Sequence, residues 1–142
     1  MKIYLDVCCF NRPYDNQEQL KIKLETEAKL FIQQEILSGK HDLVWSYILE
    51  YENNRNPYEE KRNAIKLWKD VAKIYCEENF EVIEQAEKLA KQGLKIKDAL
   101  HVACAINALA KYFITTDKQL LSAKIKGIRI INPVDFIDRL EE

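Results

Sequence analysis

Acidic side chains stand at the edges of apolar segments in four separate parts of this chain. The residues are Asp6, Glu52 or its neighbour Glu50, Asp98 and Asp117. Carboxylates that are brought together repel one another unless a hard cation lies among them. Mg²⁺ or Mn²⁺ is the usual cation in such a site, and a phosphate ester is its usual substrate. The residue types therefore favour a divalent-metal site that acts on phosphate.

Each acid also has a purely structural explanation. Asp98 and Asp117 suit the N-cap of a helix, where the helix dipole stabilises a negative charge. Glu50 and Glu52 would lie on a solvated helix face, and Asp6 would form a turn. The set is harder to explain in this way, because Asp6 follows an apolar strand with no basic residue nearby in sequence to pair with it.

The apolar pattern predicts strands and helices in alternation. Strands are expected at residues 3–7, 43–45, 112–116 and 128–131. Helices are expected at about residues 19–38, 46–52, 56–75, 81–92, 98–111, 117–123 and 133–140. The apolar stripe of the first long helix is predicted to be Leu20, Leu24, Ala28, Phe31 and Glu35. This alternation favours an α/β domain whose mainly parallel sheet is covered by helices on both faces.

The expected sheet would gather the acids at one edge. Sites in open parallel sheets form outside the carboxyl ends of the strands. Asp6 ends the first expected strand, and Asp117 ends the third. Asp98 begins the helix that leads into that third strand, and Glu52 lies on the short helix after the second. Four separate segments therefore converge on one place.

The composition bounds the class of protein. A chain of 142 residues is the size of one domain, which we take to span residues 1–142. With 47% hydrophobic and 32% charged residues, it is neither disordered nor fibrous. A net charge of −1 means that any contact with nucleic acid depends on local clusters of lysine and arginine.

The sequence favours a cytoplasmic protein with reduced thiols. Asp6 comes too early for the apolar region of a signal peptide, and the apolar stretch 99–110 is too short to span a bilayer. Neither a CxxC pair nor a histidine at zinc-binding spacing accompanies the cysteines, which are Cys8, Cys9, Cys76 and Cys104. We therefore expect free thiols and no zinc site.

Four motifs together resemble those of the PIN domain. They are Tyr4-Leu5-Asp6, the segment 46–52, Lys97-Asp98-Ala99-Leu100-His101-Val102-Ala103 and Phe113-Ile114-Thr115-Thr116-Asp117. PIN domains are metal-dependent ribonuclease domains, and the family includes the VapC-like toxins of many bacterial and archaeal toxin–antitoxin pairs. The resemblance covers nearly the whole chain. Its most specific part is the D-A-L-H-x-A motif, followed by the apolar strand and Thr-Thr-Asp.

The resemblance implies a fold, a cofactor and partners. The fold would be a three-layer α/β/α sandwich around a mainly parallel sheet. The catalytic and metal-binding residues, holding Mg²⁺ or Mn²⁺, would be Asp6, Glu52 (or Glu50), Asp98 and Asp117. The activity would be endonucleolytic hydrolysis of RNA by metal-activated water, which leaves a 5′-phosphate and a 3′-hydroxyl. The partners would be an RNA substrate, an antitoxin protein and a second copy of the chain. A homodimer is also favoured by the aromatic residues of the middle helices, Tyr58, Trp68 and Tyr75.

The chain departs from the family pattern at two places. Val7-Cys8 follows Asp6 where Thr-Asn or Thr-Ser is usual, and no acid follows Asp117 two or three positions later. The number of metal ions therefore stays open. Asn11 and Ser122 are further candidates to support the site.

Glu50 and Glu52 cannot both face one metal ion, because residues two apart on a helix point about 200° apart. Glu52 lies nearer the inward stripe of Ile48 and Leu49, so it is the favoured ligand. Glu50 is expected to lie in solvent or to pair with a lysine.

Other polar residues have clear candidate roles. His101 follows Asp98 by one helical turn, and a packed, hydrogen-bonded role is favoured over that of a catalytic base. Basic residues along two helices are candidates for phosphate contacts. These are Lys61, Arg62, Lys66, Lys69, Lys73, Lys88, Lys91, Lys95 and Lys97, together with Arg12 and Arg55.

Two other enzyme classes fit the sequence poorly. A haloacid-dehalogenase-type phosphatase needs a second Asp two residues after the first, and that position is Cys8. A response-regulator receiver needs an acidic pair at its first strand, whereas Asp6 stands alone. The alternative that stays open is a PIN-like fold that serves as a catalytically weak RNA-binding or protein-assembly module.

Overall fold

Strands and helices alternate along the chain in the computed structural model, which describes residues 1–141. The strands are β1 (Lys2–Leu5), β2 (Asp42–Ser46), β3 (Ile74–Cys76), β4 (Tyr112–Ile114) and β5 (Arg129–Ile131). Between β1 and β3 lie α1 (Val7–Asn11), the 3₁₀ turn η1 (Arg12–Tyr14), α2 (Leu20–Leu37), α3 (Tyr47–Asn54) and α4 (Glu59–Val71). After β3 come α5 (Phe80–Lys91), α6 (Ile96–Asn107), α7 (Lys118–Ser122) and α8 (Pro133–Leu140).

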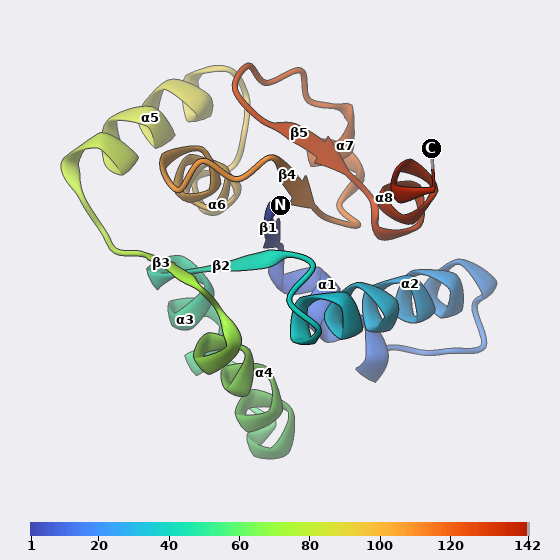
Figure 1. The fold of residues 1–142 in the computed structure, drawn as a ribbon. Helices are drawn as coiled ribbons and strands as arrows, with labels where there is room; N and C mark the ends of the chain where they lie inside the picture. Colours follow the sequence, from blue (N-terminus) through green and yellow to red (C-terminus); the bar gives the residue numbers. More distant parts are fainter. Residues whose placement is uncertain (142) are drawn as a thin grey trace.

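All strand pairs in the central sheet are parallel, and the strand order is β3-β2-β1-β4-β5. β1 is central, so Tyr4 pairs with Val44 of β2 on one side and with Phe113 of β4 on the other. Figure 1 shows α5 and α6 on one side of the sheet and α2, α3 and α4 on the other. The predicted α/β sandwich with a parallel sheet is therefore confirmed.

The central strands are apolar because both faces of the sheet are covered. Ile3, Tyr4 and Leu5 of β1 are fully buried, as are Phe113 and Ile114 of β4. The rings of Tyr4 and Phe113 stack with their centroids 5.1 Å apart. This packing fixes β1 against β4, and both strands end at the edge where Asp6 and Asp117 follow.

The predicted helix at residues 56–75 was wrong at both ends, and its last residues belong to a strand that was not predicted. α4 runs only from Glu59 to Val71, Ala72 is extended, and β3 pairs with β2 through Ile74, Tyr75 and Cys76. The helical spacing of the apolar residues continues into the strand without a glycine or proline to mark the change. A short apolar run of this kind fits either element, so periodicity alone did not separate them.

The predicted apolar stripe of α2 was also largely wrong. Leu20, Leu24 and Phe31 are 69%, 47% and 47% exposed, whereas Ile32 and Ile36 are buried. The helix buries polar residues as well, because it packs against α1, η1 and α8.

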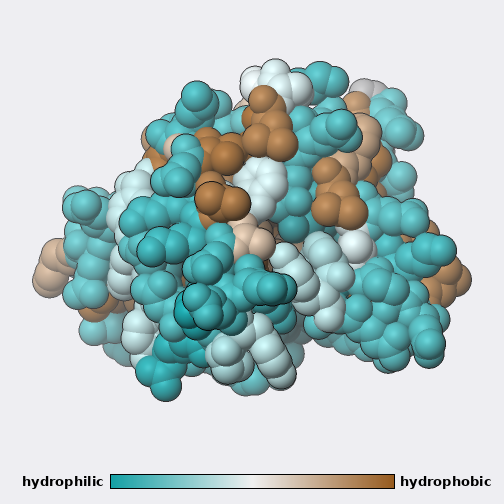
Figure 2. Space-filling view, turned by 90° about the horizontal axis from the view of Figure 1, so that it is seen from below, coloured by the Kyte–Doolittle hydropathy of each residue, from teal (hydrophilic) through white to brown (hydrophobic). Residues whose placement is uncertain are grey.

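The face of the molecule in Figure 2 is mainly hydrophilic, with apolar side chains in small separate groups. Within residues 1–141, no helix is both long and apolar enough to cross a membrane.

Candidate active site

Asp6 is held at the carboxyl end of β1 by contacts from two directions. It caps α1, a short helix that the sequence did not predict, by accepting a hydrogen bond from the Val7 N–H at 2.8 Å. Its other carboxylate oxygen accepts the Thr115 hydroxyl at 2.8 Å. The side chain is nearly fully buried, with 4% of its surface exposed. A buried carboxylate in this position is stabilised by donors, and no lysine or arginine pairs with it in the described ion pairs.

Thr115 connects Asp6 to Asp117. Its Oγ1 accepts the Asp117 N–H at 3.1 Å while its O–H donates to Asp6. Asp117 caps α7, as predicted, by accepting hydrogen bonds from the N–H groups of Gln119 and Leu120 at 2.8 and 3.3 Å. A single hydroxyl thus sets the spacing between the ends of β1 and β4.

Asp98 lies in the first turn of α6 and is not its N-cap. The helix begins at Ile96 and is capped at Lys95 without a side-chain hydrogen bond, which corrects the predicted start. Burial raises the pKa of Asp98, and the negative charges of Asp6 and Asp117 raise it further. Asp98 on α6 therefore shares one electrostatic environment with Asp6, which caps α1, and with Asp117, which caps α7.

Glu52 contacts His101, which lies on α6 one helical turn after Asp98. The Nε2 atom of His101 lies 2.8 Å from a carboxylate oxygen of Glu52. Burial would raise the pKa of Glu52, but the hydrogen bond and charge of His101 outweigh it and leave the pKa below its usual value. Burial lowers the pKa of His101, and the Glu52 hydrogen bond with the charges of Asp6, Glu52 and Asp98 raises it overall.

His101 is in turn held by Tyr4. The Tyr4 hydroxyl lies 2.6 Å from His101 Nδ1 and 2.7 Å from the Ser46 Oγ, and all three side chains are buried. Ser46 also caps α3, as predicted, by accepting the Leu49 N–H. A buried chain of hydrogen bonds therefore runs from the start of α3 to the carboxylate of Glu52. The expected packed, hydrogen-bonded role of His101 is confirmed.

Glu50 points elsewhere. Its carboxylate contacts Lys69 Nζ at 2.6 Å and accepts the Tyr75 hydroxyl at 2.8 Å. Both contacts lower its pKa, the Lys69 contact most strongly. The expectation that Glu50 would pair with a lysine is confirmed, and Glu52 is the glutamate that lies with His101.

Cys8 is a site residue that the sequence did not single out. Its Sγ lies 3.6 Å from Asp6 Oδ2 and 3.4 Å from Thr115 Oγ1, and it accepts the Thr116 N–H at 3.3 Å. The departure from the family pattern at positions 7 and 8 therefore places a thiol, in contact with Asp6, where Asn or Ser is usual.

Asn11 lines a hollow of about 290 Å³ that has Glu52 on its wall.

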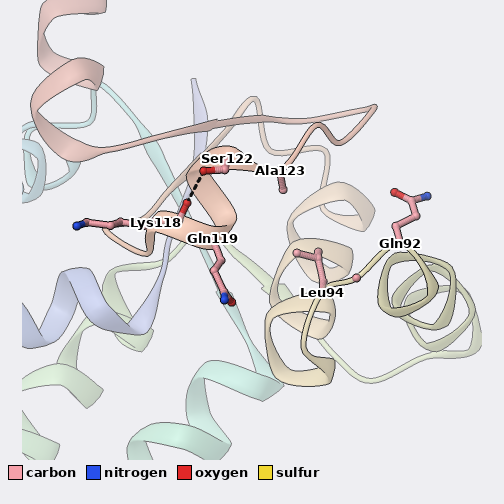
Figure 3. A pocket seen from close by; sticks show the side chains of 7 residues that line it. Gln92, Leu94, Lys118, Gln119, Ser122 and Ala123 are labelled. Carbon is pink, nitrogen blue, oxygen red and sulfur yellow. Dashed lines mark hydrogen bonds between the residues drawn. The ribbon is translucent and has the colours of Figure 1, made fainter.

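Ser122 lies away from the acids. Its hydroxyl donates to the Lys118 carbonyl at 2.9 Å, and the residue is exposed at the end of α7. Figure 3 shows it beside a separate pocket of about 480 Å³, between α7 and the segment around Leu94 that leads into α6. Asn11 shares a hollow with Glu52, whereas the described hydrogen bond of Ser122 is within its own helix.

The donor set suits a hard divalent cation. Asp6, Asp98 and Asp117 offer carboxylate oxygens, the ligands that Mg²⁺ and Mn²⁺ prefer. In the conformations described for residues 1–141, no three His, Cys, Asp or Glu side chains lie close enough together to coordinate an ion.

These features define an α/β protein with an acidic site at the carboxyl edge of a parallel sheet. The sequence profile of the PIN domain matches residues 3–126, so the chain belongs to the PIN domain family. The family resemblance read from the D-A-L-H-x-A motif is confirmed by this match.

Solved structures share the fold at low sequence identity. One is VapBC2 from Rickettsia felis bound to a DNA fragment from its promoter, with a TM-score of 0.56, 16% identity, and coverage of 93% of this chain and 98% of that one. Another is VapBC-1 from nontypeable Haemophilus influenzae, with a TM-score of 0.55, 18% identity, and coverage of 94% and 98%. No curated protein matches the chain.

Proposed function

We propose that this chain is a divalent-metal-dependent endoribonuclease that hydrolyses RNA phosphodiesters. The observation that carries the proposal is the placement of Asp6 and Asp117 after the paired parallel strands β1 and β4, where the Thr115 hydroxyl donates to the Asp6 carboxylate and accepts the Asp117 N–H. Membership of the PIN domain family supports a nuclease. Mg²⁺ or Mn²⁺ is the proposed cofactor, with Asp6, Glu52, Asp98 and Asp117 as its ligands.

A bound Mg²⁺ or Mn²⁺ would polarise the phosphodiester and lower the pKa of water. The protein's own contribution is to place the carboxylates. Thr115 holds Asp6 and Asp117 at a set distance, and His101 holds Glu52. In the reaction, the oxygen of water bonds to phosphorus while the bond from phosphorus to O3′ breaks. Water loses one proton and O3′ gains one, which leaves a 5′-phosphate and a 3′-hydroxyl.

The decisive experiment measures cleavage of an end-labelled single-stranded RNA by the purified chain. We expect cleavage in Mg²⁺ or Mn²⁺, loss of cleavage in excess EDTA, recovery when the metal is restored, and no cleavage by Asp98→Asn. Cleavage that persists in excess chelator would overturn the metal mechanism. Tight RNA binding without cleavage under any of these conditions would favour the alternative of a catalytically weak RNA-binding module.

We further propose that the nuclease acts as the toxin of a toxin–antitoxin pair. The structural neighbours support this, because both are VapBC structures. An antitoxin partner and a homodimer belong to the same proposal. Expression of the wild-type chain in bacteria should arrest growth, whereas Asp98→Asn should not. Sedimentation at micromolar concentration tests the dimer, and a monomer there would overturn it.

A further inference from the structure

Two exposed tyrosines enclose a lysine beside the candidate active site. The Lys61 ammonium lies 5.4 Å from the ring centroid of Tyr14 and 5.9 Å from that of Tyr58. Tyr14 is 51% exposed and Tyr58 is 68% exposed, so neither ring is needed to fill the core. Large aromatic rings left in solvent next to a cation are typical of surfaces that bind ligands with flat rings and negative charge.

Two hollows that share Tyr58 and Lys61 lie between this pair of tyrosines and Glu52. The hollow of about 290 Å³ with Glu52 on its wall is also lined by Arg55, Tyr58 and Lys61. A second hollow of about 490 Å³ shares Tyr58 and Lys61 and extends to Tyr14. Tyr58 and Lys61 therefore belong both to the hollow that contains Glu52 and to the hollow that contains Tyr14.

A second cation and ring repeat the arrangement nearby. The Arg55 guanidinium lies 5.5 Å from the ring centroid of Tyr51, which is 48% exposed, and donates a hydrogen bond to the Tyr51 hydroxyl at 3.1 Å. We call the group formed by Tyr14, Tyr51, Arg55, Tyr58 and Lys61 the tyrosine–cation surface.

The two cations of this surface keep their charge available. Neither Lys61 nor Arg55 takes part in any of the ion pairs described for residues 1–141. Arg12, by contrast, is neutralised by its ion pairs with Asp15 and Glu25. The Arg12 pair also removes the charge of Asp15 from the second hollow, which leaves Glu60 as the unpaired carboxylate among its lining residues.

We propose that the tyrosine–cation surface binds single-stranded RNA on one side of the cleaved bond, with bases stacked on Tyr14 and Tyr58 and phosphates against Lys61 and Arg55. The inference rests on the proposed nuclease function and adds the strandedness of its substrate. Bases paired in a duplex must lose their pairing and stacking before they can lie on a protein ring, whereas unpaired bases are free to do so. A peptide segment of a partner protein is the competing occupant, and the alternation of rings with unpaired cations favours the nucleic acid.

The stacking contacts can be tested in the Asp98→Asn background, where RNA should bind without being cut. The probe is a short fluorescein-labelled single-stranded RNA of mixed sequence, measured by fluorescence anisotropy. Tyr58→Ala and Tyr14→Ala should each raise the Kd by roughly 5- to 100-fold. Tyr58→Phe keeps the ring and should bind nearly as well as the parent, and an RNA duplex should bind all variants more weakly.

Two substitutions of charged residues should change the Kd for RNA in opposite directions. Lys61→Met should raise the Kd and lower the slope of log affinity against log salt concentration by about 0.7, the value for one phosphate contact to a single strand. Glu60→Gln removes the unpaired negative charge beside Lys61 and should lower the Kd. The matched control on α5 is Phe80→Ala, since Phe80 is 80% exposed and lies off this surface. This substitution should not change the Kd.

Cleavage kinetics separate this inference from the nuclease proposal. In the wild-type background, Tyr58→Ala should raise the KM for single-stranded RNA and change kcat little. If metal-dependent cleavage is present and both tyrosine variants keep the wild-type KM and Kd, the inference is overturned and the nuclease stands. If the variants bind RNA normally but lose a co-expressed partner protein, the surface belongs to that partner and the inference is likewise overturned. If RNA binds at this surface without any cleavage, the nuclease proposal and the placement beside a cleaved bond both fail, and only the RNA-binding role of the two tyrosines is kept.

Discussion

The Nε2 atom of His101 lies 2.8 Å from Oε1 of Glu52, 49 residues away in sequence. A carboxylate only accepts hydrogen bonds, so Nε2 carries the proton and donates it. In the neutral imidazole, Nδ1 is then the acceptor for the Tyr4 hydroxyl at 2.6 Å. The orientation of Glu52 therefore depends on a hydroxyl of β1, which makes Tyr4 a positioning residue.

Tyr4→Phe tests this relationship, because it removes one hydroxyl and keeps the ring that stacks on Phe113. We expect Mn²⁺ affinity, measured by calorimetry, and cleavage to fall by about 10- to 100-fold, as is usual when a group that orients a metal ligand is lost. The free energy of unfolding should fall by about 1–3 kcal/mol, because a buried His101 nitrogen loses its partner.

Tyr47→Phe is the matched control for that substitution. The Tyr47 hydroxyl is buried and has no hydrogen-bond partner among the described residues, so its removal should leave metal affinity and cleavage unchanged and stability equal or higher. Equal effects of Tyr4→Phe and Tyr47→Phe on metal affinity would show that Tyr4 does not position Glu52.

Asp98→Asn should abolish cleavage without weakening the metal-free fold. Asp98 does not cap α6, so no cap is lost, and its raised pKa means that the charged form is disfavoured in the folded chain. The melting temperature without metal should stay equal or rise, while the increase produced by Mn²⁺ in the wild type should disappear. A variant that still gains stability from Mn²⁺ would show that Asp98 is not a ligand.

The Glu52–His101 pair predicts a pH window for stability without metal. The pKa of Glu52 is lowered from 4.5, so its contribution is present above that value and is lost as the pH falls through the lowered pKa. The pKa of His101 is raised from 6.5, so its contribution is present below that value and is lost as the pH rises through the raised pKa.

The stability difference between wild type and Glu52→Gln should therefore be largest between pH 4.5 and 6.5 and shrink on both sides. Urea unfolding at a series of pH values in EDTA measures this difference. A difference that stays constant from acid to alkaline pH would show that the ion pair does not form.

The parts of the fold that could be predicted from sequence are those set by local pattern. The apolar runs of β1 and β4 and the capping residues Ser46 and Asp117 are found because a few neighbouring residues determine them, although both strands end two residues earlier than predicted, at Leu5 and Ile114. β3 was missed because its three residues continue the helical spacing of α4. Short segments need their partner strand to be identified.

The candidate site divides in the same way. The acids are visible in the sequence because each stands at the end of an apolar segment. The contacts that hold them are not: Thr115 lies 109 residues from Asp6, and Tyr4 lies 97 residues from His101. A hydroxyl inside an apolar strand gives no local sign of the carboxylate or imidazole that it meets once the sheet has formed.

The two glutamates of α3 offer a comparison within one helix. Glu50 is tied to Lys69 and Tyr75, whereas Glu52 is tied to His101 beside the aspartates. Glu52→Gln removes a proposed metal ligand, so cleavage should fall at least as far as in Tyr4→Phe, and Mn²⁺ affinity should fall with it.

Glu50→Gln should leave cleavage near the wild-type rate. It breaks a partly exposed ion pair, which stabilises the fold by about 0.2–1 kcal/mol, so urea unfolding should shift only slightly. That shift should also shrink in high salt, because partly exposed charges are screened. Loss of cleavage in Glu50→Gln with activity kept in Glu52→Gln would reverse the assignment of the ligand, while the proposed nuclease would still stand on the three aspartates.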